Sequence, residues 1–129
     1  MILLDASVLV RYLRTSSPTI REVLASASCG ICGVTRAEIL YGARTVTDAA
    51  NLRVAMDAFI QVPIEMDIWD HLGDHLASLR VKGFPTPFQD VLLATIAIHN
   101  NVEVWSYDTH FRTIQAAVPA LRLFDGPLA

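Results

Sequence analysis

Long apolar stretches are missing from this sequence of 129 residues, although 53% of its residues are apolar. The longest run of apolar residues and threonine extends from Val91 to Ile98, whereas a membrane-spanning helix needs about 20 such residues. Met1–Leu4 contains no basic residue and leads directly into Asp5, which is not typical of a cleaved signal peptide. The sequence therefore predicts a soluble, cytoplasmic protein with no membrane partner, and its length predicts one domain over residues 1–129.

Positive charge is scarce as well. One lysine, Lys82, and nine arginines stand against 13 acidic residues, which gives a formal net charge of −3. Proteins that attract nucleic acid through their overall charge usually carry an excess of basic residues. The charge balance therefore disfavours nucleic-acid binding unless something offsets the carboxylates.

Several catalytic motifs are absent. The sequence contains neither the G-x-x-x-x-G-K motif of P-loop proteins nor G-x-G-x-x-G, and it has no nucleophile-elbow pattern. A phosphoacceptor receiver domain would need an acidic pair near its first strand and a late lysine, but Asp5 has no acidic neighbour. These absences exclude the corresponding nucleotide-binding, serine-hydrolase and receiver functions.

Cysteine is rare, and both cysteines lie in Cys29-Gly30-Ile31-Cys32. Such a motif is typical of thiol oxidoreductases when a strand precedes it and a helix start lowers the pKa of a thiol. Here the preceding segment, Ile20–Ser28, has the apolar spacing of a helix. Because free cysteines are often buried, we favour two structural thiols, and a thiol oxidoreductase using Cys29 and Cys32 is the alternative.

Short apolar runs alternate with helical patterns along the whole chain. The predicted strands are Ile2–Leu4, Gly30–Val34, Gln61–Ile64, Val102–Trp105 and Leu121–Phe124. The predicted helices are Ala6–Arg14, Ile20–Ser28 with Pro18 in its first turn, Thr35–Arg44, Thr47–Ile60, Asp67–Lys82, Phe88–Asn100 and Asp108–Val118. Because parallel strands need helical crossovers, this alternation predicts an α/β fold with a short, mostly parallel sheet.

Four acidic residues occur where an α/β sheet usually carries its chemistry. Asp5 ends the first strand, Glu38 follows the second strand within a turn, Asp108 follows the fourth strand, and Asp90 opens the most apolar helix. Each has an ordinary explanation as a helix cap or dipole partner, and Thr35-Arg36-Ala37-Glu38 fits a capping box. In parallel sheets, however, ligands bind beyond the carboxyl ends of the strands.

Together, the four carboxylates would repel one another and would need a counter-charge. No lysine lies near any of them in the sequence. Mg²⁺ or Mn²⁺ held by carboxylate oxygens would satisfy all four, and such an ion activates water for attack on a phosphodiester. The pattern therefore predicts metal-dependent phosphodiester hydrolysis.

Four blocks of this chain resemble those of PIN-domain nucleases, more narrowly the VapC toxins of bacterial type II toxin–antitoxin systems. The blocks are Ile2-Leu3-Leu4-Asp5-Ala6-Ser7-Val8-Leu9-Val10, Val34-Thr35-Arg36-Ala37-Glu38-Ile39-Leu40-Tyr41-Gly42, Phe88-Gln89-Asp90-Val91-Leu92-Leu93-Ala94-Thr95-Ile96-Ala97 and Val104-Trp105-Ser106-Tyr107-Asp108-Thr109-His110-Phe111. No single block is specific, but their order within one small chain is.

The resemblance implies a three-layer α/β/α fold and an endoribonuclease with a metal-activated water. It implies that Asp5, Glu38, Asp90 and Asp108 bind Mg²⁺ or Mn²⁺ and that Ser7 and Ser106 support them. His110 stands where many relatives carry another acid. The resemblance also implies a homodimer and inhibition by a VapB-like antitoxin, and a catalytically silent binding module with the same fold is the alternative.

Two further patterns have more than one interpretation. His71 and His75 have the spacing of a zinc-binding helix, but Leu72 stands where a zinc protease needs glutamate, so a solvated helix face is favoured. Five arginines lie within nine residues of the predicted acids and either bind phosphate or form ordinary ion pairs. They are Arg11, Arg14, Arg36, Arg44 and Arg112.

Overall fold

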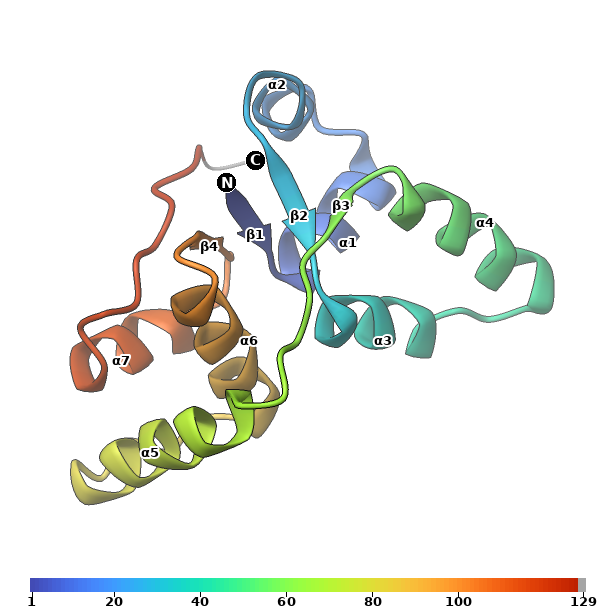
Figure 1. Cartoon of the computed structure of the whole chain (residues 1–129). Coiled ribbons are helices and arrows are strands. Elements are labelled where there is room, and N and C mark those ends of the chain that lie inside the picture. Colours follow the sequence, from blue (N-terminus) through green and yellow to red (C-terminus); the bar gives the residue numbers. More distant parts are fainter. Residues whose placement is uncertain (128–129) are drawn as a thin grey trace.

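The computed structural model describes residues 1–127, in which four strands alternate with seven helices (Figure 1). The strands are β1 (Ile2–Leu4), β2 (Cys29–Ile31), β3 (Ile60–Gln61) and β4 (Glu103–Trp105). The helices are α1 (Ala6–Thr15), α2 (Pro18–Ser26), α3 (Gly33–Tyr41), α4 (Val46–Asp57), α5 (Ile68–Val81), α6 (Phe88–His99) and α7 (His110–Ala117).

All neighbouring strands are parallel, in the order β3-β2-β1-β4. Strand β1 lies inside the sheet, where Ile2 is opposite both Cys29 and Glu103, and Leu4 is opposite Trp105. The predicted parallel α/β sheet is confirmed. Asp5 directly follows β1 and therefore lies at the end of the sheet, between the ends of β2 and β4.

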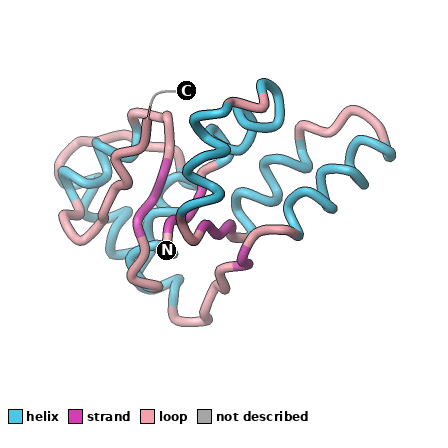
Figure 2. The backbone as a smooth tube through the Cα atoms, turned by 90° about the horizontal axis from the view of Figure 1, so that it is seen from above, coloured by secondary structure: helices cyan, strands magenta, loops and turns pink. Residues whose placement is uncertain are grey.

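Alternating side chains of β1 divide the apolar core between the two faces of the sheet. Leu3 packs into a cluster with α5, α6 and α7, whereas Ile2 and Leu4 pack into a second cluster with residues of α1, α2, α3 and α4. Figures 1 and 2 show these helices on either side of the strands, with α3 and α4 extending outward as a pair. The predicted three-layer α/β/α arrangement is confirmed.

The apolar segment from Val91 to Ile98 belongs to α6, which lies in the centre of one helical layer. Six residues of this apolar segment are buried, namely Val91, Leu93, Ala94, Thr95, Ile96 and Ala97. Within the described residues, no helix is both long enough and apolar enough to cross a membrane. The high apolar content of the chain is thus partly explained by a helix that is covered by protein on most sides.

The boundaries of the second crossover differ from those predicted. Helix α3 begins at Gly33, and the capping box is wrong because Thr35 lies inside the helix, where its Oγ1 donates to the carbonyl oxygen of Leu4 over 2.8 Å. This buried bond ties α3 to the end of β1. Further on, α4 ends at Asp57 because Ile60–Gln61 pairs with β2 as a strand, earlier than the predicted strand at Gln61–Ile64.

The predicted last strand, Leu121–Phe124, is reduced to an isolated bridge. Leu123 pairs in parallel with Val104, and the amide of Phe124 donates to the Val104 carbonyl over 2.8 Å. The apolar run therefore lies beside β4 as predicted, but it does not form a regular strand.

The two cysteines lie on opposite faces of the sheet. Cys29 packs in the cluster of α1 and α2, and Cys32 packs in the cluster of α5 and α6. Burial raises the pKa of both thiols, which disfavours the reactive thiolate. A Cβ at Gly30 would lie 2.9 Å from Val62 Cγ2, so close strand packing explains the glycine between them. The motif is therefore structural.

Candidate functional site

Asp5 combines two structural roles at the end of β1. It is the N-cap residue of α1, and its Oδ2 accepts hydrogen bonds from the Ser7 amide at 3.3 Å and the Ser7 hydroxyl at 2.7 Å. The Ser106 hydroxyl donates to the same oxygen at 2.7 Å. These bonds hold the buried carboxylate in one orientation and leave its Oδ1 out of all three contacts.

Ser7 and Ser106 each use their hydroxyl twice. Each donates its single proton to Asp5 and accepts a backbone N–H from the loop after β4, at 3.0 Å from Tyr107 to Ser7 and at 2.9 Å from Asp108 to Ser106. The two serines therefore join the ends of β1 and β4. Through them the position of Asp108 depends on that of Asp5.

Asp90 and Asp108 are bridged by His110. The Nδ1 atom of His110 lies 2.8 Å from Asp90 Oδ2 and 3.0 Å from Asp108 Oδ1, and its amide also donates to Asp108 Oδ1 at 3.0 Å. Burial raises the pKa of Asp90, while the hydrogen bond to Asp90 raises the pKa of His110. The imidazole thus lies between two carboxylates, and its protonated form offsets their mutual repulsion.

Glu38 lies on α3 and is the most exposed of the four predicted acids. Partial burial and the negative charges of Asp5, Asp90 and Asp108 raise its pKa to about 6. The charges act on one another because all four carboxylates lie at the same edge of the sheet. The structure therefore brings the four predicted acids together.

The donor set fits a hard divalent cation. Oxygen atoms of Asp90 and Asp108 and one nitrogen of His110 all lie within 4.8 Å of one another, and carboxylate oxygens are the ligands that Mg²⁺ and Mn²⁺ prefer. Two of the arginines near the site have other partners. Arg11 lies over the ring of Tyr107 at 4.4 Å, and Arg36 pairs with Asp57 at 2.9 Å.

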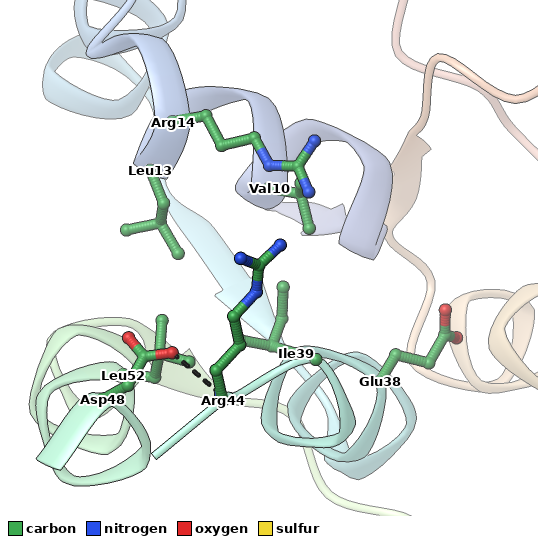
Figure 3. A pocket seen from close by; sticks show the side chains of 9 residues that line it. Val10, Leu13, Arg14, Glu38, Ile39, Arg44, Asp48 and Leu52 are labelled. Carbon is green, nitrogen blue, oxygen red and sulfur yellow. Dashed lines mark hydrogen bonds between the residues drawn. The ribbon is translucent and has the colours of Figure 1, made fainter.

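A pocket of about 350 Å³ opens beside the acids, between α1, α3 and α4. Figure 3 shows Arg14 from α1 and Arg44 from the loop after α3 directed toward this space, with Glu38 at its edge. The amide of Arg44 donates to Asp48 at 3.2 Å, which fixes that loop. The lining is otherwise largely apolar, with Val10, Leu13, Ile39 and Leu52.

Sequence reasoning missed two contributions to the site. The sequence pattern marks His110 only as a departure from the family, whereas in the structure its ring bridges Asp108 to Asp90. The pattern predicts Thr35 as a helix cap, whereas it anchors α3 and hence Glu38 to β1. Both contacts join elements far apart in the sequence, which local patterns do not reveal.

Comparison with known proteins identifies the same fold and family. The ribonuclease VapC17 of Mycobacterium tuberculosis is 28% identical over 123 residues, which cover 93% of this chain and 91% of that protein. DNA-bound VapBC of Salmonella typhimurium superposes with a TM-score of 0.84 at 21% identity, over 95% of this chain and 96% of that one. VapBC2 of Rickettsia felis, bound to a promoter DNA fragment, superposes with a TM-score of 0.82 at 21% identity, over 96% and 98%.

A family model for the PIN domain matches residues 2–117. This range contains the sheet, all seven helices and every acid described above. The chain therefore belongs to the PIN domain family.

Proposed function

We propose that this protein is the toxin of a type II toxin–antitoxin system and acts as a metal-dependent endoribonuclease. The observation that carries the proposal is the convergence of four carboxylates, two of which His110 bridges. They belong to Asp5, Glu38, Asp90 and Asp108. The similarity to ribonucleases VapC17 and VapC18 supports the substrate class.

Each acid has a proposed role. Asp5, Asp90 and Asp108 hold Mg²⁺ or Mn²⁺, which when bound lowers the pKa of a water and stabilises charge on a phosphodiester. Glu38, whose pKa of about 6 is close to neutrality, completes the ligand set or orients the attacking water. Ser7 and Ser106 keep the Asp5 carboxylate in place, and water is the nucleophile, so no covalent intermediate forms.

Charge neutralisation reconciles this proposal with the acidic composition. The formal charge of −3 includes the four acids of the site, and each divalent cation would add two positive charges. Arg14 and Arg44 beside the site and Arg112 near Asp108 would then be available to bind RNA phosphates.

The test is cleavage of bulk RNA by the purified chain with Mg²⁺ or Mn²⁺, with and without EDTA. We expect cleavage that EDTA abolishes and that Asp5→Asn lowers by more than about 100-fold, because it removes a metal ligand. Asp57→Asn, which changes an acid outside the site, is the matched control. Binding of RNA without metal-dependent cleavage would instead indicate a catalytically silent binding module.

We further propose that a VapB-like antitoxin covers the pocket between α1, α3 and α4. Tyr41, Val46 and Val54 on α3 and α4 are 93%, 89% and 73% exposed, and solved relatives include VapBC and FitAB complexes. A basic residue of the antitoxin tail would meet Glu38 at the pocket edge. Light scattering of the chain, alone and with the product of an adjacent short gene, tests both the homodimer and the complex.

A matched pair of variants tests the location of this contact. Val54→Asp places a charge on α4 and should prevent inhibition by the antitoxin while leaving RNA cleavage intact. Val81→Asp changes an equally exposed valine on α5, away from the pocket, and should leave inhibition unchanged. Unchanged inhibition of the Val54→Asp variant would place the antitoxin elsewhere.

A further inference from the structure

A second group of potential ligands lies where α5 begins and α6 ends. One ligand atom each from Asp67, His71 and His99 lies within 4.8 Å of the others. His99 is the last residue of α6 and lies nine positions after Asp90 near the start of the same helix, about 14 Å along the axis. This group is therefore separate from the acidic site.

The spacing within the group matches a metal site. His99 Nε2 lies 3.5 Å from Asp67 Oδ1, close to the separation of about 3.4 Å between two ligand atoms of tetrahedral Zn²⁺ with bonds near 2.1 Å. The rings of His71 and His99 have centroids 5.8 Å apart and are tilted by 44°, so their nitrogens can converge. His71 lies on the exposed surface, where side-chain rotation can shorten the remaining distances.

The side chain of Asp67 does not cap the helix that it precedes. The residue occupies the N-cap position of α5, yet its side chain makes no capping hydrogen bond there. Its carboxylate faces His99 instead, with the side chain of Asp67 64% exposed and that of His99 26% exposed.

A small cavity of about 90 Å³ adjoins these residues and is lined by His71, His75, Thr95, Ile98 and His99. Thr95 Oγ1 donates its proton to the Val91 carbonyl at 2.7 Å, so the His75 Nδ1 at 2.8 Å must be the donor to Thr95. His75 is thereby held one helical turn beyond His71. The cavity leaves room for the water that usually completes a three-ligand site.

We propose that Asp67, His71 and His99 bind one Zn²⁺-class ion, which clamps the start of α5 to the end of α6. Imidazole nitrogens favour Zn²⁺, Co²⁺ or Ni²⁺ over Mg²⁺, whereas the acidic site with its four carboxylates favours hard cations. The clamp does not depend on the nuclease proposal. It assigns a role to His71 that the spacing with His75 alone did not reveal.

The test uses the full chain in excess Mg²⁺, added to compete for the acidic site, with Zn²⁺ added by equilibrium dialysis. We expect one tightly bound Zn²⁺ per chain, with affinity lowered at least about tenfold in His71→Asn and in His99→Asn. Asp67→Asn removes the third proposed ligand and should lower the Zn²⁺ affinity as well. Its control is Asp74→Asn on α5, which should bind Zn²⁺ with the affinity of the parent chain. Ring-nitrogen NMR shifts on adding Zn²⁺ should appear at His71 and His99.

A second variant keeps the two sites distinguishable. His110→Asn alters only the acidic site and should leave this Zn²⁺ equivalent in place. Loss of the equivalent in His110→Asn but not in His71→Asn would overturn the proposal, as would failure of the parent chain to bind Zn²⁺. Because His71 is exposed, we expect His71→Asn to fold as the parent chain does. A thermal melt in EDTA measures this.

Discussion

Ser106 donates its hydroxyl proton over 2.7 Å to Asp5, a residue 101 positions earlier in the chain. The same hydroxyl accepts the amide of Asp108 at 2.9 Å. One small side chain therefore links an acid at the end of β1 to an acid at the end of β4. The candidate site depends on this link for its geometry.

Ser106→Ala removes a donor from the Asp5 carboxylate and leaves the Asp108 amide without its acceptor. We expect a loss of about 1–3 kcal/mol in the free energy of unfolding, measured by urea denaturation. RNA cleavage should fall about 10- to 100-fold, as is usual for residues that orient a metal ligand. Ser106→Thr keeps the hydroxyl and should restore both, whereas Ser26→Ala on the exposed end of α2 should change neither.

Glu38→Gln should stabilise the metal-free protein above pH 6. In the folded chain the pKa of Glu38 is raised from an ordinary value of 4.5 to about 6, so ionisation opposes folding as the pH rises through this window. Below about pH 4.5 the glutamate is protonated in both states and the substitution should have little effect. Thermal melting in EDTA at several pH values measures the difference, and equal melting temperatures at pH 8 would contradict the proposed repulsion.

His110→Asp introduces a further carboxylate and removes the bridge between Asp90 and Asp108. We expect a lower melting temperature in EDTA, because three carboxylates then face one another without the imidazole. We also expect a higher affinity for Mg²⁺ relative to Mn²⁺, since an oxygen ligand replaces a nitrogen. Competition between the two ions, followed by the Mn²⁺ electron spin resonance signal, measures this preference. An unchanged preference would mean that His110 does not contact the ion.

Cys29→Ser should destabilise the fold without affecting RNA cleavage. The substitution buries a hydroxyl in the apolar cluster that contains Ile2 and Ile31, at a cost of about 1–3 kcal/mol. Thiol titration should show both cysteines unreactive until the chain unfolds, since burial raises the pKa of each. Disulfide reductase activity lost in Cys29→Ser would contradict the structural role.

Local patterns predict much of this fold. The apolar run Ile2–Leu4 followed by Asp5 predicts the central strand and its polar end, and Gly83 after a helical pattern predicts the end of α5. Boundaries are wrong where a distant partner decides them. Thr35 lies inside α3, where its hydroxyl donates to the Leu4 carbonyl. Ile60 lies outside α4 because it pairs with β2 as a strand.

The four acids could be predicted because each follows a strand or opens a helix, and parallel strands end at one edge. The bridge of His110 to Asp90 and the approach of His99 to Asp67 could not, because each depends on how two helices pack. Composition was also an incomplete guide. Net charge alone disfavours RNA, although the site concentrates negative charge at a single edge where cations could neutralise it.

Helix α6 fixes the separation between the two candidate ion sites. Its buried middle, from Leu93 to Ala97, cannot slide without opening cavities, so the ends at Asp90 and His99 stay about 14 Å apart. Two divalent ions at that distance in water repel by roughly 1 kcal/mol, most of which is screened at physiological ionic strength. Binding of an ion at one site should therefore be independent of binding at the other. In a mixture of Mg²⁺ and Zn²⁺, one ion would bind near each end of α6.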